Sequence, residues 1–141
     1  MSEEKLVIYS DGGARGNPGP AAAAFIINRN GRVIHSQAEY LGISTNNFAE
    51  YSGVLIALTW LKRNPNQIDG KVKFFLDSEL VVNQLKGEYK IKNLKLKEVM
   101  SKIKNIEKDL KNKIEYDAIP RTKNKIADHL VNKVLNEKLT S

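Results

Sequence analysis

Two aspartates follow apolar runs at positions where the chain could place metal-dependent chemistry. Asp11 comes after the run over 6–9 and directly before a glycine- and proline-rich stretch, and Asp77 comes after the run over 72–76. If these runs are parallel neighbouring strands, both carboxylates emerge at the carboxyl-end rim of one sheet, where open α/β sheets place their sites. An aspartate at a strand end is also an ordinary turn former, so neither residue alone establishes a site.

Glu50 and Asp128 lie near the starts of two expected helices. Asn47 as N-cap, with Glu50 three residues later, would form a capping box, and this is the alternative to a metal-binding role for Glu50. Asp128 falls at the margin of the apolar stripe of its helix, where it either meets the sheet edge or simply interacts with the helix dipole.

The case for chemistry therefore rests on the four acids as a set. Gathered at one rim without cations, they would raise one another's pKa values and destabilise the fold. Divalent cations remove that repulsion, and two of them together activate a water and stabilise the leaving oxygen of a phosphodiester. The chain has no cysteine and only two histidines, so oxygen ligands, and hence Mg²⁺ or Mn²⁺, are favoured.

The elements that must position these acids follow from apolar periodicity and turn signals. We expect strands over 5–10, 21–28, 32–40, 72–76 and 113–119, and helices over 47–63, 79–86, 96–110 and 124–138. A turn is expected over Gly12–Gly19, and Asn30-Gly31 is a hairpin signal. Three hairpin-joined strands followed by strand–helix alternation predict an α/β fold: a five-stranded mixed sheet, first an antiparallel meander and then parallel strands, flanked by helices.

The length, composition and net charge of the chain indicate the class of protein to which it belongs. At 141 residues, with 41% hydrophobic and 28% charged residues, the chain is expected to be one domain over 1–141. It has no apolar stretch long enough to span a membrane and no visible secretory signal, so a cytoplasmic protein with no membrane partner is expected. A monomer is expected as well. The net charge is +7, and the segment 90–113 holds nine lysines against three acids. That segment indicates either a nucleic-acid contact or a solvated helix face.

Four motifs in order resemble ribonuclease H, type 1, over nearly the whole chain. They are Tyr-Ser-Asp-Gly-Gly-Ala-Arg-Gly-Asn-Pro-Gly-Pro at 9–20, Thr-Asn-Asn-Phe-Ala-Glu-Tyr at 45–51, Leu-Asp-Ser-Glu-Leu-Val at 76–81 and Asn-Lys-Ile-Ala-Asp-His-Leu at 124–130. The resemblance implies an endonuclease that cleaves the RNA strand of an RNA–DNA hybrid with two Mg²⁺ ions, which Mn²⁺ can replace, and leaves 5′-phosphate and 3′-hydroxyl ends.

The resemblance also implies roles for individual residues. The metal ligands would be Asp11, Glu50, Asp77 and Asp128. The hybrid would be held by a set of small and polar residues: Gly12, Gly13, Asn17, Thr45, Asn46, Glu79 and Asn124. Without the resemblance, Asn17 would be assigned as a turn former and Thr45 as a residue near a helix cap.

The chain departs from the family pattern in three places. Many members carry a histidine in the loop before the last helix, whereas this loop has Arg121, which cannot act as a base at neutral pH and is assigned to phosphate or product contact. His129 is expected on the helix surface. A tryptophan- and lysine-rich protrusion is absent; Trp60 is expected in the core or at its rim, and the lysines over 86–113 are candidates for contact with the DNA strand.

Glu79 is the third departure, since members often have glutamine there to contact an RNA 2′-hydroxyl. A carboxylate still accepts that hydrogen bond but lies near phosphates, which leaves activity on double-stranded RNA open. Two other hypotheses remain: a metal-dependent nuclease or phosphotransferase for other duplexes, and a nucleic-acid-binding module without catalysis. Retention of all four acids argues against the last.

Overall fold

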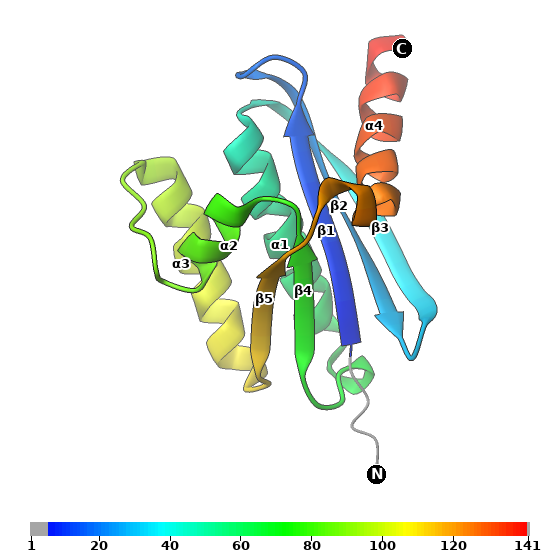
Figure 1. Cartoon of the computed structure of the whole chain (residues 1–141), viewed down its shortest axis with the longest axis vertical. Coiled ribbons are helices and arrows are strands. Elements are labelled where there is room, and N and C mark those ends of the chain that lie inside the picture. Colours follow the sequence, from blue (N-terminus) through cyan, green and yellow to red (C-terminus); the bar gives the residue numbers. More distant parts are fainter. Residues whose placement is uncertain (1–5, 141) are drawn as a thin grey trace.

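A computed structural model describes residues 6–140 and contains a single mixed sheet (Figure 1). Its strands lie in the order β3-β2-β1-β4-β5, with β1, β2 and β3 antiparallel and with β4 and β5 parallel to β1. The bounds are β1 (Leu6–Ala14), β2 (Gly19–Arg29), β3 (Arg32–Ser44), β4 (Val72–Leu76) and β5 (Ile114–Ala118). This confirms the expected five-stranded sheet; Lys5, the expected first strand residue, lies outside the described residues.

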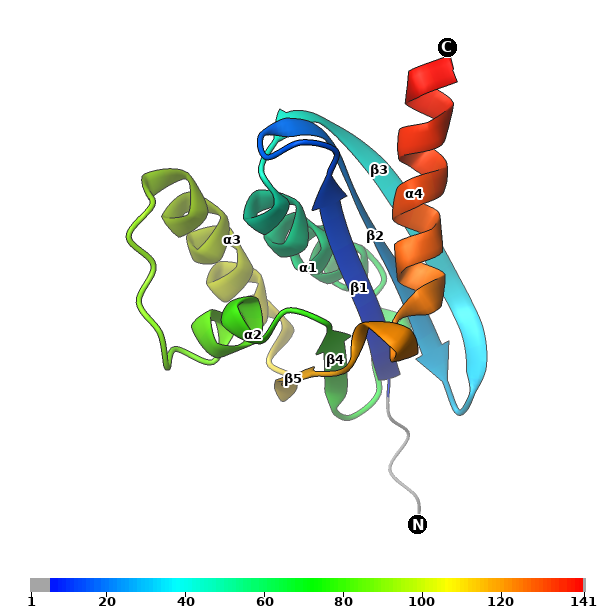
Figure 2. The same ribbon diagram turned by 45° about the horizontal axis from the view of Figure 1, so that its top comes forward.

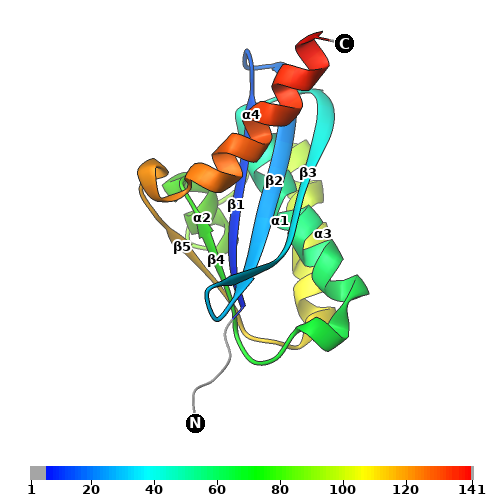
Figure 3. The same ribbon diagram turned by 90° about the vertical axis from the view of Figure 1, so that its right-hand side faces the viewer.

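Helices cover both faces of the sheet. They are α1 (Asn46–Arg63), α2 (Glu79–Leu85), α3 (Leu94–Leu110) and α4 (Lys125–Thr140), with short 3-10 turns η1 (Pro65–Gln67) and η2 (Arg121–Lys123). Figure 3 shows α1 and α3 on one face and α4 on the other. The expected order of strands and helices is confirmed, and none of the helices within residues 6–140 is long and apolar enough to cross a lipid bilayer.

The two faces of the sheet are packed differently. On the α1 face, large side chains fill the core, among them Phe25, Phe74, Leu58 and Ile103. On the α4 face, β2 presents the small residues Ala22 and Ala24 to Val131 and Leu135. Strand β2 is thus covered on both sides, which explains its continuous apolar run.

The expected turn over Gly12–Gly19 is wrong at its start. Strand β1 continues to Ala14, which pairs with Ala21, and the tight turn is closed by a hydrogen bond from Arg15 N to Pro20 O of 2.8 Å. Gly12 lies within the strand, and a glycine is required there because α1 packs directly on it. A Cβ at Gly12 would be 2.1 Å from the carbonyl carbon of Ala49. The glycine signalled a close helix contact rather than a chain reversal.

The N-cap of α1 also differs from the expectation. Thr45 is the cap, with its Oγ1 accepting from Phe48 N at 3.2 Å, so the capping box of Asn47 and Glu50 does not form. Glu50 therefore lies beyond the first turn of the helix. Other ends differ by a few residues: β3 runs on to Ser44, and α4 begins at Lys125 after Asn124.

Trp60 and His129 lie where the sequence predicted them. Trp60 packs against the main core and stacks on His35, with ring centroids 4.6 Å apart. His129 is exposed on α4. Neither histidine lies among the acidic residues described below.

Candidate active site

Asp11 and Asp77 occupy equivalent positions on two parallel neighbours. The pairing of β1 with β4 runs from Leu6↔Val72 to Tyr9↔Phe75. Each aspartate lies two residues beyond the last pair that joins β1 to β4, Tyr9↔Phe75, so both side chains leave the same face at the same height. Strand β4 ends at Leu76, whereas β1 continues along β2. Asp11 thus lies within a strand rather than at its end, beside the place where its neighbour stops.

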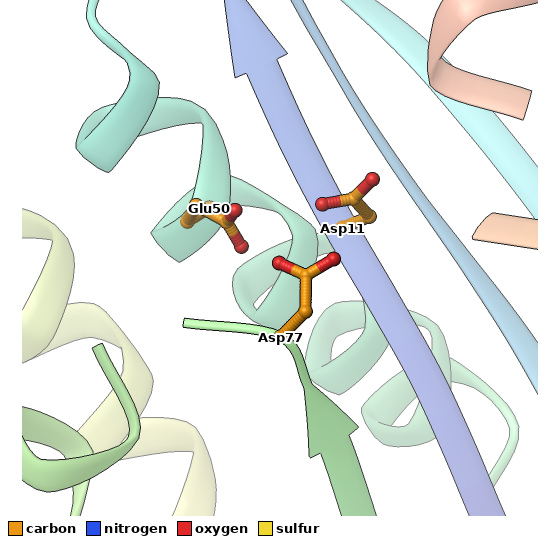
Figure 4. Close-up of side chains that lie close together, drawn as sticks. All are labelled: Asp11, Glu50 and Asp77. Atoms are coloured by element: carbon orange, nitrogen blue, oxygen red, sulfur yellow. The ribbon is translucent and has the colours of Figure 1, made fainter. Parts of the chain in front are cut away.

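Helix α1 brings Glu50 to this rim because its backbone lies unusually close to β1. Two glycines permit the approach: Gly12 on the strand, and Gly53 on the helix, where a Cβ would be 2.8 Å from the carbonyl oxygen of Asp11. The carboxylates of Asp11, Glu50 and Asp77 consequently point toward one another (Figure 4), and one oxygen from each lies within 4.8 Å of the others.

This acidic triad carries a large electrostatic cost without a cation. Asp11 and Glu50 are only 5% and 9% exposed. Burial, followed by the charge of Asp77, raises the pKa of Asp11 to about 7. Burial, followed by the charges of Asp11 and Asp77, raises the pKa of Glu50 to about 9.

The donor atoms of the acidic triad suit a hard divalent cation. Glu50 Oε2 and Asp77 Oδ2 are buried and have no hydrogen-bond partner among the residues that the structure describes. Buried carboxylate oxygens without donors are unusual because each loses its hydration, and a cation would restore that interaction. The residues present therefore fit a magnesium-type ion, held by oxygen ligands from three different elements.

Asp128 lies near the acidic triad but is not part of it. It is half-buried on α4 and lines a groove of about 520 Å³ together with Asp11, Glu50 and Arg121. Its negative charge is one of the causes that raise the pKa of Asp11. The structure thus brings the fourth expected acid to the same groove, on the opposite face of the sheet from α1.

Arg121 reaches the groove from the connection between β5 and α4. In Figure 2 this connection crosses in front of β1 on its way to α4. Arg121 is exposed in η2, and its positive charge lowers the pKa values of Asp11 and Glu50, against the larger effect of burial. The groove therefore contains a positively charged side chain, Arg121, as well as the acids. A site that binds a phosphate beside metal ions would use such a side chain for the phosphate.

Asn124 is placed differently from the expected substrate contact. Its side chain is 1% exposed, and its Nδ2 donates to Ser10 O at 2.9 Å. Its carbonyl oxygen accepts from Asp128 N at 3.1 Å. Asn124 thus joins the residue before Asp11 to the start of the helix that carries Asp128. Its burial favours a structural role, and the substrate contact stays a prediction.

The other expected substrate contacts form a polar edge beside the groove. Asn46 Oδ1 accepts from Ala14 N at 2.8 Å, and Asn17 Oδ1 accepts from Asn46 N at 3.0 Å. Asn17, Thr45 and Asn46 are all exposed. The hydrogen bonds tie the β1–β2 turn to the start of α1.

The three remaining candidates differ in accessibility. Gly12 is buried beneath α1, whereas Gly13 is half-buried, and both line the groove. Glu79 is exposed as the first residue of α2, two residues beyond Asp77.

Three residues of the site were not identified from the sequence: Arg15, Gly53 and Asn132. Gly53 had a signal, since a glycine inside an amphipathic helix destabilises it unless close packing requires it. Arg15 lies within the first motif but was not singled out. Asn132 is on α4 one helical turn beyond Asp128, at the same face.

The fold and the acidic triad can be compared with those of known protein families. Residues 9–134 match the model of a family described as reverse transcriptase-like. Among solved structures, a type 1 ribonuclease H from compost, LC11-RNase H1, in complex with an RNA/DNA hybrid, is 41% identical with a TM-score of 0.90; the match covers 95% of this chain and 99% of that one. RNase H1 from Halobacterium salinarum is 28% identical with a TM-score of 0.86, covering 94% and 98%.

The match to the compost structure along nearly the full length of both chains makes the family assignment specific. The chain belongs to the ribonuclease H family, type 1. Proteins of Mycobacterium bovis and Mycobacterium tuberculosis are 32% identical over 94% of this chain, one of them named as bifunctional. The chain spans only 36% of the length of these proteins.

Proposed function

We propose that the chain is an endonuclease that hydrolyses the RNA strand of RNA–DNA hybrids. The observation that carries the proposal is the acidic triad: three carboxylates from β1, α1 and the end of β4 converge within 4.8 Å, although two of them are almost completely buried. Membership of the type 1 family supports the choice of substrate, since a relative at 41% identity was solved with an RNA/DNA hybrid.

The acidic triad and Asp128 would hold two Mg²⁺ ions, which Mn²⁺ can replace. When bound, the ions supply activation of a water and stabilisation of the leaving oxygen. Asp11, Glu50 and Asp77 hold their oxygens in place through the packing of α1 on the sheet, so little reorganisation is required at the moment of reaction. The proposed products carry 5′-phosphate and 3′-hydroxyl ends.

The remaining groove residues would bind and orient the duplex. Arg121 is assigned to the scissile phosphate or to the product phosphate, because a guanidinium remains charged at neutral pH and forms a fork that fits phosphate. Gly13, Asn17, Thr45 and Asn46 lie along the adjacent edge, where short polar groups contact 2′-hydroxyls and phosphates without reading bases. Glu79 is proposed to accept from a 2′-hydroxyl, and activity on double-stranded RNA is the second outcome to be measured.

A strand-labelling assay tests the proposal. Each strand of an RNA–DNA duplex is labelled in turn, and cleavage is followed in Mg²⁺ and in Mn²⁺, with double-stranded RNA and double-stranded DNA beside it. Cleavage of the RNA strand of the hybrid with 5′-phosphate ends is the expected result. Cleavage of DNA duplexes instead would favour a different nuclease on this fold, and binding without cleavage would favour a module that has lost catalysis.

We further propose that residues 1–141 act as a single domain, as a monomer in the cytoplasm. The continuous sheet and its two helix layers support one folding unit over 6–140. Sedimentation of the purified chain with and without hybrid tests the monomer, and a 2:2 complex would contradict it.

A further inference from the structure

Arg15 is a cation of the groove to which the proposed function gives no role. It follows the end of β1 and lines the same groove as Asp11, Asp128 and Arg121. Its backbone is held on two sides: Arg15 N donates to Pro20 O at 2.8 Å, and Gly19 packs so closely that a Cβ there would be 2.0 Å from the carbonyl oxygen of Arg15. The side chain therefore leaves a well-defined point on the groove wall.

The guanidinium of Arg15 is oriented by a neutral partner. Arg15 Nη2 donates to Asn132 Oδ1 at 3.3 Å, and Asn132 Nδ2 donates to Asp128 O at 3.1 Å. Within residues 6–140, no carboxylate forms an ion pair with Arg15. An arginine that is half-buried, oriented by an amide and not neutralised by an acid keeps its charge available for an external anion.

The position of Arg15 in the groove indicates which phosphate of a bound strand it would contact. The acidic triad lies on one side of the groove, and the proposed function requires the scissile phosphate to bind there. Arg15 and Asn132 form the wall on the α4 side. Arg121, on η2, is the second cation of the groove. Phosphates follow one another along a strand, so a strand seated on the acidic triad presents a neighbouring phosphate to one of the groove walls.

We infer that Arg15 binds a backbone phosphate next to the scissile one on the RNA strand, and that Asn132 is a positioning residue that holds its guanidinium toward that phosphate. This inference rests on the proposed function, because it requires an RNA strand on the acidic triad. Arg15 contacts the strand without reading its bases, so its contribution is the same for every sequence.

The test compares Arg15→Gln with Arg63→Gln, a matched loss of charge at the exposed end of α1. Both are measured for hybrid binding in an inactive Asp77→Asn background. Arg15→Gln is expected to weaken binding about tenfold and to reduce the slope of log affinity against log salt by about one. Arg63→Gln is expected to change neither. Equal affinity and slope for Arg15→Gln and the parent would overturn the inference.

A modified substrate locates the contact. A neutral methylphosphonate is placed at successive phosphates of the RNA strand. The parent protein is expected to lose affinity at one position adjacent to the cleaved bond, and Arg15→Gln is expected to be insensitive at that position alone. An identical pattern of losses for both proteins would show that Arg15 is only a link between the turn and α4.

Two further variants separate positioning from structure. Asn132→Ala is expected to weaken binding less than Arg15→Gln does, while Arg15→Lys retains the salt slope but loses part of the affinity, because lysine lacks the fork. If Asn132→Ala reduces thermal stability and Arg15→Gln does so equally, with no change in salt slope, the pair is structural. Failure of the parent chain to cleave any hybrid would instead reject the proposed function, whatever these binding results.

Discussion

At the scale of single residues, Asp77 combines a proposed catalytic role with a destabilising charge. Replacement by asparagine keeps the shape of the side chain, removes one charge from the acidic triad and lowers the pKa values of Asp11 and Glu50 toward their ordinary range. Asp77→Asn is expected to reduce cleavage at least about a thousandfold, which removal of an electrostatic group at the transition state can cause. It is also expected to raise the melting temperature of the metal-free protein.

The control for this charge effect is Asp109→Asn. Asp109 forms a surface ion pair with Lys62 at 3.0 Å, with both side chains more than half exposed. Its loss is expected to change stability by less than about 1 kcal/mol and to leave cleavage unchanged. Normal turnover of Asp77→Asn would contradict the assignment of the metal site.

The raised pKa values make the stability of the metal-free protein depend on pH. In the folded state the pKa of Asp11 is about 7 and that of Glu50 about 9, against ordinary values of 3.8 and 4.5. The folded chain binds these protons more tightly than the unfolded chain, so the stabilisation is complete below the unfolded values and is lost as the pH rises through the folded ones. The free energy of unfolding should therefore fall between about pH 5 and pH 9.

Urea unfolding in a chelating buffer across this range measures the effect. Asp11→Asn is expected to flatten the decline, and saturating Mg²⁺ is expected to oppose it, since a cation favours the ionised carboxylates. A metal-free stability that rises steadily from pH 5 to 9 would contradict the raised pKa values of Asp11 and Glu50.

At the scale of elements, the contact between α1 and β1 sets the geometry of the site. Gly12→Ala would place a methyl group 2.1 Å from the backbone of Ala49, which no flexible side chain can relieve. We expect a loss of about 3 kcal/mol in stability, as for other severe overpacking, and weaker Mg²⁺ binding. Gly13→Ala is the matched control: its new Cβ would have only Val131 within contact distance, at 3.9 Å, so stability should change by less than about 1 kcal/mol.

A second link between elements is the buried amide of Asn124. Asn124→Ala removes the donor to Ser10 O and leaves that carbonyl unpaired, at a cost of about 1–3 kcal/mol. Because Asn124 precedes α4 and its carbonyl oxygen accepts from Asp128 N, cleavage is expected to fall while hybrid binding in the absence of cleavage is retained. Asn105→Ala, at an exposed position of α3, serves as the control. Loss of hybrid binding with full stability would instead show that Asn124 contacts the substrate.

At the scale of the whole molecule, positive charge is concentrated in the segment 90–113, which contains α3 and the residues that flank it. Helix α3 buries Val99 and Ile103 and leaves Lys95, Lys97 and Lys102 exposed. If these lysines contact the DNA strand, hybrid affinity should fall steeply with salt, and replacing all three with glutamine should reduce the slope by about 0.9 for each contact removed. Lys104 is unsuited to this test, because its Nζ donates to Leu85 O. A flat plot of log affinity against log salt would contradict the contact.

Much of this architecture could be predicted, because periodicity reports which side chains are buried. The order of elements followed from it, and so did the shared rim of Asp11 and Asp77 once their strands were taken as parallel neighbours. The place of Glu50 at that rim rested on the family resemblance, because its local pattern alone favoured a capping box. What periodicity cannot report is how closely two backbones approach. For that reason Gly12 was interpreted as a turn residue and Gly53 was not noticed, although together they bring Glu50 to the sheet.

Hydrogen bonds between distant segments were equally invisible in the sequence. Thr45 and Asn47 are both good caps, and only the three-dimensional path of the chain selects Thr45. The burial of Asn124 and the pairing of Arg15 with Asn132 join residues more than one hundred positions apart. No local pattern marks such partners, and the polar residues involved resemble surface residues until the fold is known.

The register between β1 and β4 also determines where the chain tolerates a change of length. Asp11 and Asp77 are each two residues beyond the pair Tyr9↔Phe75, so their alignment depends on these short spacers and not on the chain between the strands. Insertions in the β2–β3 turn or in the connection from α1 to β4 leave both carboxylates in place. One added residue after Tyr9 or Phe75 turns an acid to the opposite face of the sheet. Length variation within the family is therefore expected in the turns and excluded from these two spacers.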